Sequence, residues 1–147
     1  MEPLSRDAMR KLLDLLKAAP LGDTPQPIKV IGRQYPEGFY KAEDGHLVRS
    51  IVEREIDDFL YGKGILHAYE KLIPGEKEFY CDFYLPQYNL WIEFWGREGD
   101  PEYERRKREK LSQYRREGLK LFEIHKEDVP KLKDILSKLL EDLNKLR

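Results

Sequence analysis

The chain has 147 residues with a net charge of −1, and 40% of them are hydrophobic. This length favours one domain with a single core, and the apolar content excludes an intrinsically disordered chain. No apolar run is long enough to span a membrane, and the first twenty residues lack the features of a secretory signal. The single cysteine, Cys81, excludes a disulfide framework, so we expect a cytoplasmic protein. A net charge near zero argues, at first sight, against a nucleic-acid partner.

The sequence pattern divides the chain at about residue 46. Residues 4–19 carry apolar side chains at three- and four-residue spacing, which predicts an amphipathic helix that ends at Pro20. Residues 28–47 mix glycine, proline and charges, which is typical of a connector. We therefore expect an N-terminal helix and connector over residues 1–45 and a folded domain over residues 46–147.

The predicted domain begins with a helix over residues 48–61, which Gly62 and Gly64 terminate. The elements expected after it are strands over 66–73, 78–85 and 90–95, a charged helix over 101–117, a strand over 119–124 and a closing helix over 129–146. The order αβββαβα predicts an α/β fold with a mixed four-stranded sheet flanked by helices.

Two acidic residues, Asp82 and Glu93, flank the loop 86–89 between the second and third predicted strands. If the hairpin is symmetric about this loop, paired positions sum to 175 and Asp82 lies opposite Glu93. The acids then share a face with Tyr80, Tyr84, Trp91 and Trp95. The opposite face, predicted as core, holds Phe79, Cys81, Phe83, Leu90, Ile92 and Phe94.

Like charges directly across a hairpin destabilise it, and semi-apolar surroundings make two bare carboxylates still more costly. A divalent cation between them would remove the repulsion, and oxygen ligands of this kind suit Mg²⁺ or Mn²⁺. An edge hairpin with a solvated face, or a shifted register, would separate the acids without a metal. Glu53 is a third candidate ligand, although its position three residues after Ser50 also fits a helix-capping role.

Charge is unevenly distributed along the chain. Residues 50–102 carry a local charge of −7, whereas residues 103–120 carry +5. One face of the basic helix combines Tyr103, Lys107, Lys110, Leu111 and Tyr114. Either the lysine stems pack there with their ammonium groups in water, or one ammonium lies beside the acidic pair. The remaining bases could contact a phosphate backbone: Arg105, Arg106, Arg108, Arg115 and Arg116, with Lys107.

Four blocks of the sequence occur together in a known order. The runs Val48-Arg-Ser-Ile-Val-Glu53, Asp82-Phe-Tyr-Leu-Pro86 and Ile92-Glu-Phe-Trp-Gly96, followed by the helix from Tyr103 to Tyr114, resemble the PD-(D/E)XK nuclease superfamily. The resemblance is to a small, mostly uncharacterised prokaryotic branch of restriction-endonuclease-like domains, and it covers about residues 46–143.

This resemblance implies a restriction-endonuclease-like αβββαβ core that cleaves phosphodiester bonds with a divalent metal. Asp82 and Glu93 match the metal-binding acids, and Glu53 matches a glutamate on the first helix. The superfamily's lysine would occupy position 95, but this chain has Trp95 there. In related branches the lysine lies on the following helix, where Lys110 is the matching position and Lys107 the second choice.

We therefore expect a Mg²⁺- or Mn²⁺-dependent endonuclease that hydrolyses DNA. RNA remains an alternative substrate, and a homodimer is a further candidate assembly. A catalytically inactive nucleic-acid-binding module on the same fold is the main alternative, and an interaction domain that docks through residues 4–19 is another. The three histidines, His46, His67 and His125, lack the spacing of a metal motif and are expected to be structural or exposed.

Overall fold

In the computed structural model, the chain divides into two compact units, residues 1–37 and 38–147. The structure describes residues 5–8, 10 and 38–146. Most of the helix predicted over residues 4–19 lies outside the described residues. No described helix is long and apolar enough to cross a membrane.

The second unit begins with a short hairpin that the sequence did not predict. Strands β1 (Tyr40–Lys41) and β2 (Leu47–Val48) pair antiparallel across a turn in which Gly45 adopts a φ of +96°. The hairpin occupies part of the expected connector because a glycine here can take the left-handed conformation that the turn requires.

The first helix of this unit, α3 (Ile51–Gly62), follows the hairpin. It begins where Ser50 Oγ accepts a hydrogen bond from the backbone N–H of Glu53 at 3.1 Å. This N-cap satisfies one of the backbone donors that have no partner within the helix. The helix therefore begins three residues later than residue 48, where periodicity alone had placed its start.

A four-stranded mixed sheet forms the centre of the unit, as expected. Its strands are β3 (Ala68–Tyr69), β4 (Phe83–Leu85), β5 (Leu90–Trp95) and β6 (Lys120–His125), in that spatial order. The first two pairings are antiparallel, and β5 pairs parallel with β6. Strands β3 and β4 are much shorter than the predicted runs 66–73 and 78–85. Glu70 adopts a φ of +54°, which takes the chain out of the extended conformation directly after β3.

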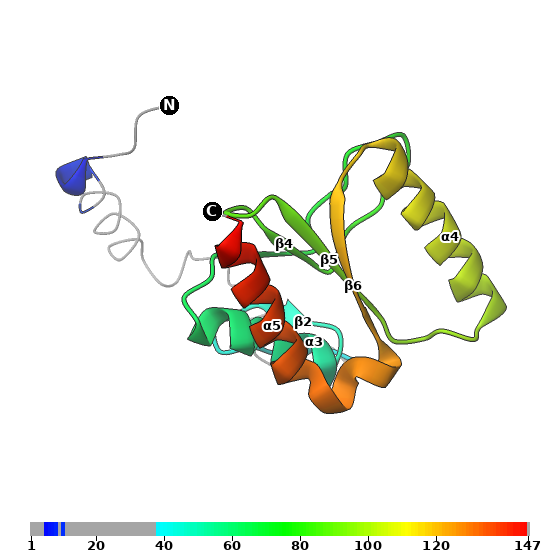
Figure 1. Cartoon of the computed structure of the whole chain (residues 1–147), viewed down its shortest axis with the longest axis horizontal. Coiled ribbons are helices and arrows are strands. Elements are labelled where there is room, and N and C mark those ends of the chain that lie inside the picture. Colours follow the sequence, from blue (N-terminus) through cyan, green and yellow to red (C-terminus); the bar gives the residue numbers. More distant parts are fainter. Residues whose placement is uncertain (1–4, 9, 11–37, 147) are drawn as a thin grey trace, which may run out of the picture. The chain divides into compact units, whose positions relative to one another are not determined.

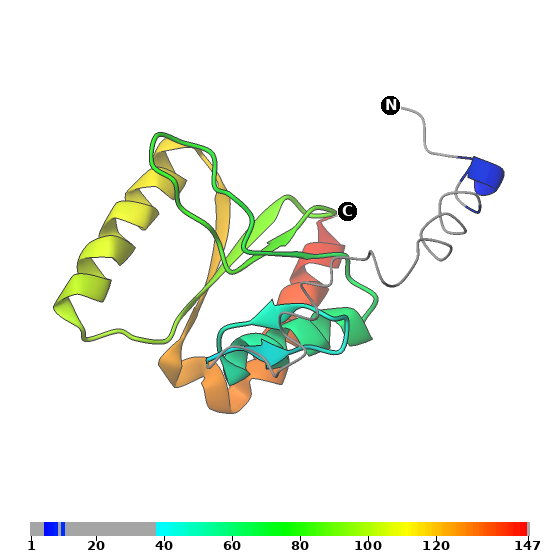
Figure 2. The same ribbon diagram turned by 180° about the vertical axis from the view of Figure 1, so that it is seen from behind.

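Helices cover both faces of the sheet. Helix α4 (Pro101–Arg116) connects the parallel strands β5 and β6 and lies on one side, whereas α3 and α5 (Leu132–Lys145) lie on the other (Figures 1 and 2). A 3₁₀ segment, Lys126–Lys131, joins β6 to α5. It contains Pro130, which explains why the regular helix begins at Leu132 instead of residue 129.

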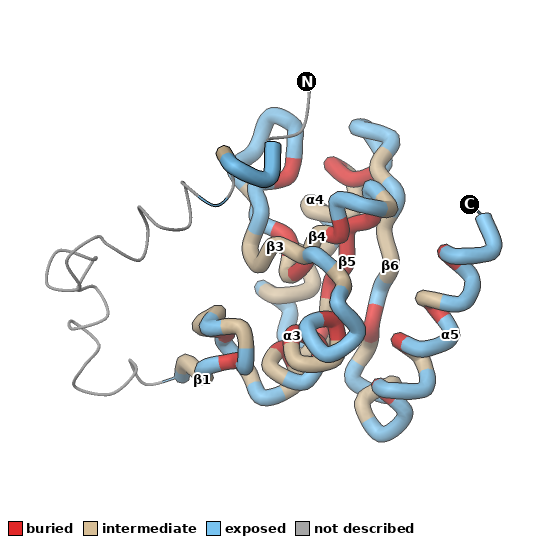
Figure 3. Tube along the Cα trace, turned by 90° about the vertical axis from the view of Figure 1, so that its left-hand side faces the viewer, coloured by how far each residue is buried: buried red, intermediate tan, exposed pale blue. Residues whose placement is uncertain are grey.

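Two hydrophobic clusters lie on opposite sides of β5, which is buried along most of its length (Figure 3). The larger cluster joins Phe83, Leu85, Leu90 and Ile92 to α3 and α5. The smaller consists of Ile73, Cys81, Trp91 and Tyr114, with Phe79 packed against it.

Cys81 and Phe79 were predicted to share the larger core with Phe83, and this prediction was wrong. Regular alternation of side chains begins only at Phe83, where β4 starts, so the preceding residues do not follow the strand period. Their packing beside Trp91 and Tyr114 places them on the α4 side of the sheet.

Candidate active site

The structure brings Asp82 and Glu93 together at the start of β4. The hairpin pairs Phe83 with Ile92 and Leu85 with Leu90, which is the symmetric register predicted from the loop. Asp82 is the residue before this ladder, and its Oδ2 accepts a 2.6 Å hydrogen bond from the backbone N–H of Phe94. Glu93, on β5, is only 1% exposed. The two carboxylates therefore meet in a largely buried setting.

Glu93 is held by two side chains of α4. Lys110 Nζ donates a 2.8 Å hydrogen bond to Oε1, and Tyr114 Oη donates one of 2.6 Å to Oε2. The two donors are four residues apart and so lie on the same side of the helix. Tyr114 therefore both packs beside Trp91 and fixes the Glu93 carboxylate.

Trp95 lies beneath the two lysines of α4. The ammonium of Lys107 is 5.1 Å from the centre of the indole, and that of Lys110 is 5.7 Å from it. The lysines then diverge, because Lys107 donates to Glu98 Oε2 at 2.8 Å whereas Lys110 contacts Glu93. Of the two candidate lysines, Lys110 is therefore the one that contacts the acidic pair.

Glu53 is held firmly at the start of α3. Its backbone is capped by Ser50, and its carboxylate accepts hydrogen bonds from Ser50 Oγ at 3.1 Å and from Tyr69 Oη at 2.7 Å. Burial raises the pKa of Glu53 to about 7, with a further contribution from the charge of nearby Asp82. The carboxylate thus lies close enough to Asp82 for the two charges to interact.

The acidic pair opens into a pocket of about 490 Å³. Cationic side chains from several segments line the pocket with Asp82 and Glu93: Arg49, Arg97, Arg106, Lys107 and Lys110. Glu70, which sequence reasoning missed, also lines the pocket and pairs with Arg49. Its left-handed backbone conformation is the local feature that turns its side chain away from strand geometry, and no residue type in the sequence signalled it.

Burial raises the pKa of both acids of the pair, and the charge of Glu93 raises that of Asp82 further. Lys110 acts in the opposite direction on each, but it offsets only part of the effect. Two adjacent carboxylates with raised pKa values, at the wall of an open pocket, form a donor set of hard oxygen atoms that suits a divalent cation. Asp82 and Glu93 are the residues that could hold it.

The predicted nucleic-acid-binding residues are distributed around α4. Arg106 and Lys107 line the pocket. Arg105 faces solvent and pairs with Glu102 and Glu109. Arg108 and Arg115 are exposed, and Arg116 lies 3.9 Å from Glu76. Only part of the predicted set therefore faces the acids.

The three histidines lie in two groups of ionisable side chains. His46 and His67 lie together with Asp44 and Asp57, and their four ligand atoms are within 4.8 Å of one another. His125 lies 3.0 Å from Glu98. The group around His46 and His67 could not be recognised from sequence spacing, because its members come from three separate segments of the chain.

Comparisons with known proteins support the fold. A scan against protein-family models and a search of curated proteins found no match. Among solved structures, the chain is similar to the homing endonuclease I-Bth0305I catalytic domain, with a TM-score of 0.50 and 18% sequence identity. The similarity covers 64% of this chain and 93% of that domain. At this identity the likeness shows a shared fold, in agreement with the mixed sheet flanked by helices.

Proposed function

We propose that the protein is a divalent-metal-dependent endonuclease of the PD-(D/E)XK type that hydrolyses phosphodiester bonds in DNA. The observation that carries this proposal is the contact between the part-buried carboxylate of Asp82 and the buried carboxylate of Glu93, beside the ammonium of Lys110 in an open pocket. The fold shared with a homing endonuclease catalytic domain supports it.

Asp82 and Glu93 would hold Mg²⁺ or Mn²⁺, which suits carboxylate oxygens and substrate phosphate. When bound, such an ion supplies a Lewis acid that acidifies water and offsets the charge of the attacked phosphate. The chain's own contribution is preorganisation. Phe94 N–H fixes Asp82, and Tyr114 fixes Glu93, so neither carboxylate has to reorient when substrate arrives.

Lys110 has the geometry for a direct role in the reaction. An ammonium has three donors, and only one is needed for the 2.8 Å hydrogen bond to Glu93. The others can orient a nucleophilic water or a phosphate oxygen in the pocket. Glu53, held by Tyr69 and close to Asp82, would complete the acidic site and help to orient its ligands.

The cations around the pocket provide the electrostatic attraction for a nucleic-acid backbone. Arg49, Arg97 and Arg106 line the pocket from three different segments, so a phosphate chain entering it would meet positive charge on more than one side. The exposed bases of α4, Arg108 and Arg115, would extend this contact beyond the pocket.

The test is cleavage of labelled single-stranded, duplex and branched DNA, and of RNA, with Mg²⁺, with Mn²⁺ and with chelator. We expect metal-dependent cleavage by the wild type and its loss in Asp82→Asn and Glu93→Gln. A suitable control is Asp142→Asn, because Asp142 is an exposed acid on α5 that pairs with Lys138. This change removes one negative charge and should leave cleavage intact.

Wild-type rates in both pocket variants would contradict the proposal. Salt-sensitive DNA binding without any metal-dependent cleavage would instead favour the catalytically inactive binding module. The two outcomes separate clearly, because binding is measured by anisotropy in chelator and cleavage by product formation.

A further inference from the structure

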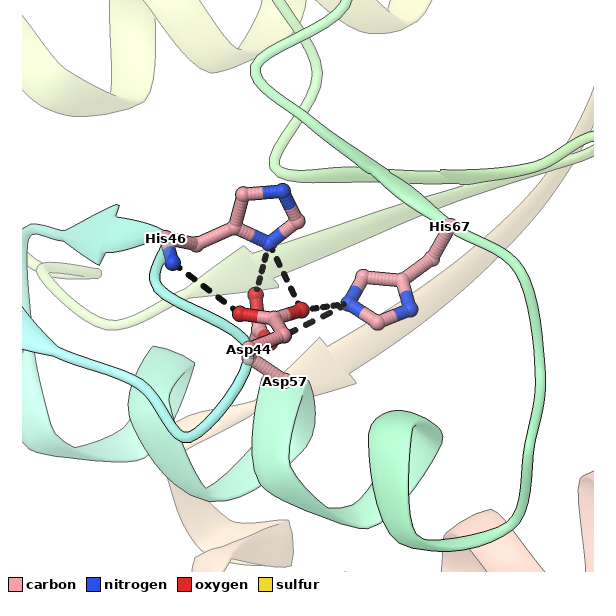
Figure 4. A group of neighbouring side chains, drawn as sticks. All are labelled: Asp44, His46, Asp57 and His67. Carbon is pink, nitrogen blue, oxygen red and sulfur yellow. Dashed lines mark hydrogen bonds and ion pairs between the residues drawn. The ribbon is translucent and has the colours of Figure 1, made fainter. Parts of the chain in front are cut away.

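A second group of ionisable side chains lies outside the pocket. Asp44 and His46 come from the turn between β1 and β2, Asp57 from α3, and His67 from the segment before β3 (Figure 4). The side chains of Asp57 and His67 are 0% and 4% exposed. Three segments separated in the sequence thus direct four metal-ligating groups toward one point.

Each imidazole of this group faces both carboxylates. His46 Nδ1 lies 2.8 Å from Asp57 Oδ2 and 2.9 Å from Asp44 Oδ2. His67 Nε2 lies 2.9 Å from Asp44 Oδ2 and 3.1 Å from Asp57 Oδ1. A ring N–H points in one direction and makes one strong, nearly linear hydrogen bond. A single N–H of each ring can therefore make a strong hydrogen bond to only one of its two carboxylate neighbours. A cation at the centre would contact both imidazole nitrogens and both carboxylates.

A contact outside the group indicates which nitrogen of His67 can act as a ligand. His67 Nδ1 lies 2.8 Å from the carbonyl oxygen of Ile65. A carbonyl only accepts, so Nδ1 carries a proton, and in the neutral ring Nε2 is the nitrogen left to bind a metal. Either a second proton on Nε2 or a cation would satisfy the two carboxylates opposite it. A backbone carbonyl that orients a histidine in this way is the usual support for a metal-binding imidazole.

Donor types and spacing select the ion. Two imidazole nitrogens and two carboxylate oxygens match a four-coordinate zinc site, in contrast to the oxygen-only pair in the pocket. Ligands at about 2.0–2.1 Å from a tetrahedral centre are about 3.3 Å apart. The four observed imidazole–carboxylate separations of 2.8–3.1 Å need to widen by only a few tenths of an ångström, and all four ligand atoms lie within 4.8 Å of one another. A divalent ion would also balance the two carboxylate charges while the rings stay neutral.

We propose that Asp44, His46, Asp57 and His67 bind a zinc ion with a structural role. Four protein ligands leave no open position for substrate, which is the arrangement of structural sites. The ion would join the β1–β2 turn to α3 and to the segment that leads into β3. Two residues after His67, Tyr69 holds Glu53, so the same ion would steady one wall of the acidic site.

A second group, Glu98, His125 and Glu127, provides the comparison. Glu98 is already neutralised by Lys107 at 2.8 Å, and Glu127 is exposed. This group has one imidazole and no buried carboxylate, so we expect it to bind zinc weakly. His125→Ala is therefore the matched control for His46→Ala, since the two side chains are equally exposed, at 37%.

The experiment uses the full chain, stripped of metal and titrated with Zn²⁺ by calorimetry and with Co²⁺ by visible absorption. We expect one tightly bound ion per chain at this site, intense absorption typical of tetrahedral Co²⁺, and a higher melting temperature with Zn²⁺. His46→Ala should weaken zinc binding by at least about 10–100-fold. His125→Ala should leave it unchanged, as should Asp82→Asn, which separates this site from the nuclease pocket.

X-ray absorption of the zinc-loaded wild type provides a test that requires no variant. A shell of nitrogen and oxygen ligands at about 2.0 Å, with two imidazoles, is expected. Absence of zinc uptake would overturn the proposal and identify the group as a network of ion pairs with protonated histidines. Unchanged zinc affinity in a folded His46→Ala protein, or loss of binding in His125→Ala, would overturn it equally.

Discussion

Asp82→Asn is expected to stabilise the metal-free protein at neutral pH. Burial and the charge of Glu93 raise the pKa of Asp82 to about 8. Glu53 on α3 and Lys110 on α4 also face this group, with opposite effects on its charge. An asparagine keeps the shape, its oxygen can accept from Phe94 N–H, and its amide can donate to Glu93.

The sign of the pH effect follows from the raised pKa. Between about pH 4 and pH 8, the folded protein holds a proton on Asp82 that the unfolded chain has released. Unfolding therefore releases a proton in this window, and the free energy of unfolding falls as pH rises, by up to about 1.4 kcal/mol per pH unit. From pH 5 to pH 7.5 the wild type should lose about 2–3 kcal/mol through Asp82, after an allowance for relaxation of the buried pair.

The assay is urea denaturation of the wild type and Asp82→Asn in chelator, at several pH values from 5 to 7.5. The two proteins should have similar free energies of unfolding near pH 5, and the variant should be more stable by about 2 kcal/mol at pH 7.5. Millimolar Mg²⁺ should restore stability to the wild type and have little effect on the variant, because binding to the folded state alone is stabilising.

Equal stabilities at pH 7.5 in chelator would refute this reasoning, because they would mean that burial and the charge of Glu93 do not raise the pKa of Asp82. A variant that is less stable at every pH would also refute it and would assign Asp82 a purely structural role. Asp142→Asn, at an exposed position on α5, is the control for the removal of one negative charge. Its stability should follow that of the wild type within about 0.5 kcal/mol across the pH range.

Three further changes test the surroundings of the pair. Lys110→Met should reduce cleavage much more than Lys107→Met, because only Lys110 contacts Glu93; equal losses in a cleavage assay would contradict this. Tyr114→Phe should lower the free energy of unfolding at pH 7 by about 2 kcal/mol in urea denaturation, since Glu93 loses a buried donor; an unchanged midpoint would argue against the 2.6 Å contact. Arg106→Ala should weaken DNA binding and reduce the slope of log K against log salt by about 1, as measured by anisotropy; an unaltered slope would exclude a phosphate contact.

The acidic pair could be predicted because the information that specifies it is local. Asp82 and Glu93 lie on either side of a four-residue loop, and the loop sets the register that pairs Leu85 with Leu90. The face of α4 that carries Lys110 and Tyr114 could also be read from helical spacing. Helical spacing could not predict which residue this face contacts, because the contact between α4 and β5 depends on how the helix packs against the sheet.

Strand lengths and the histidine group could not be predicted for different reasons. The early end of β3 depends on the positive φ of Glu70, a backbone state that no residue type there signals. The group of Asp44, His46, Asp57 and His67 depends on contacts between segments that have no fixed spacing. One signal was present: Asp57 lies on the buried side of α3 with Ile56 and Leu60, and a buried acid on an apolar helix face needs a partner.

Trp95 on β5 supports the lysines that α4 extends toward the acidic pair. Residues two apart on a strand face the same side, so position 95 shares the face of Glu93. Trp95 closes this side of the site, and its Nε1 donates to Glu123 at 2.9 Å. Its ring then serves as the surface over which Lys107 and Lys110 extend from α4, through cation–π contacts at 5.1 and 5.7 Å. The ammonium beside Glu93 therefore comes from α4, and the ring that supports it comes from β5.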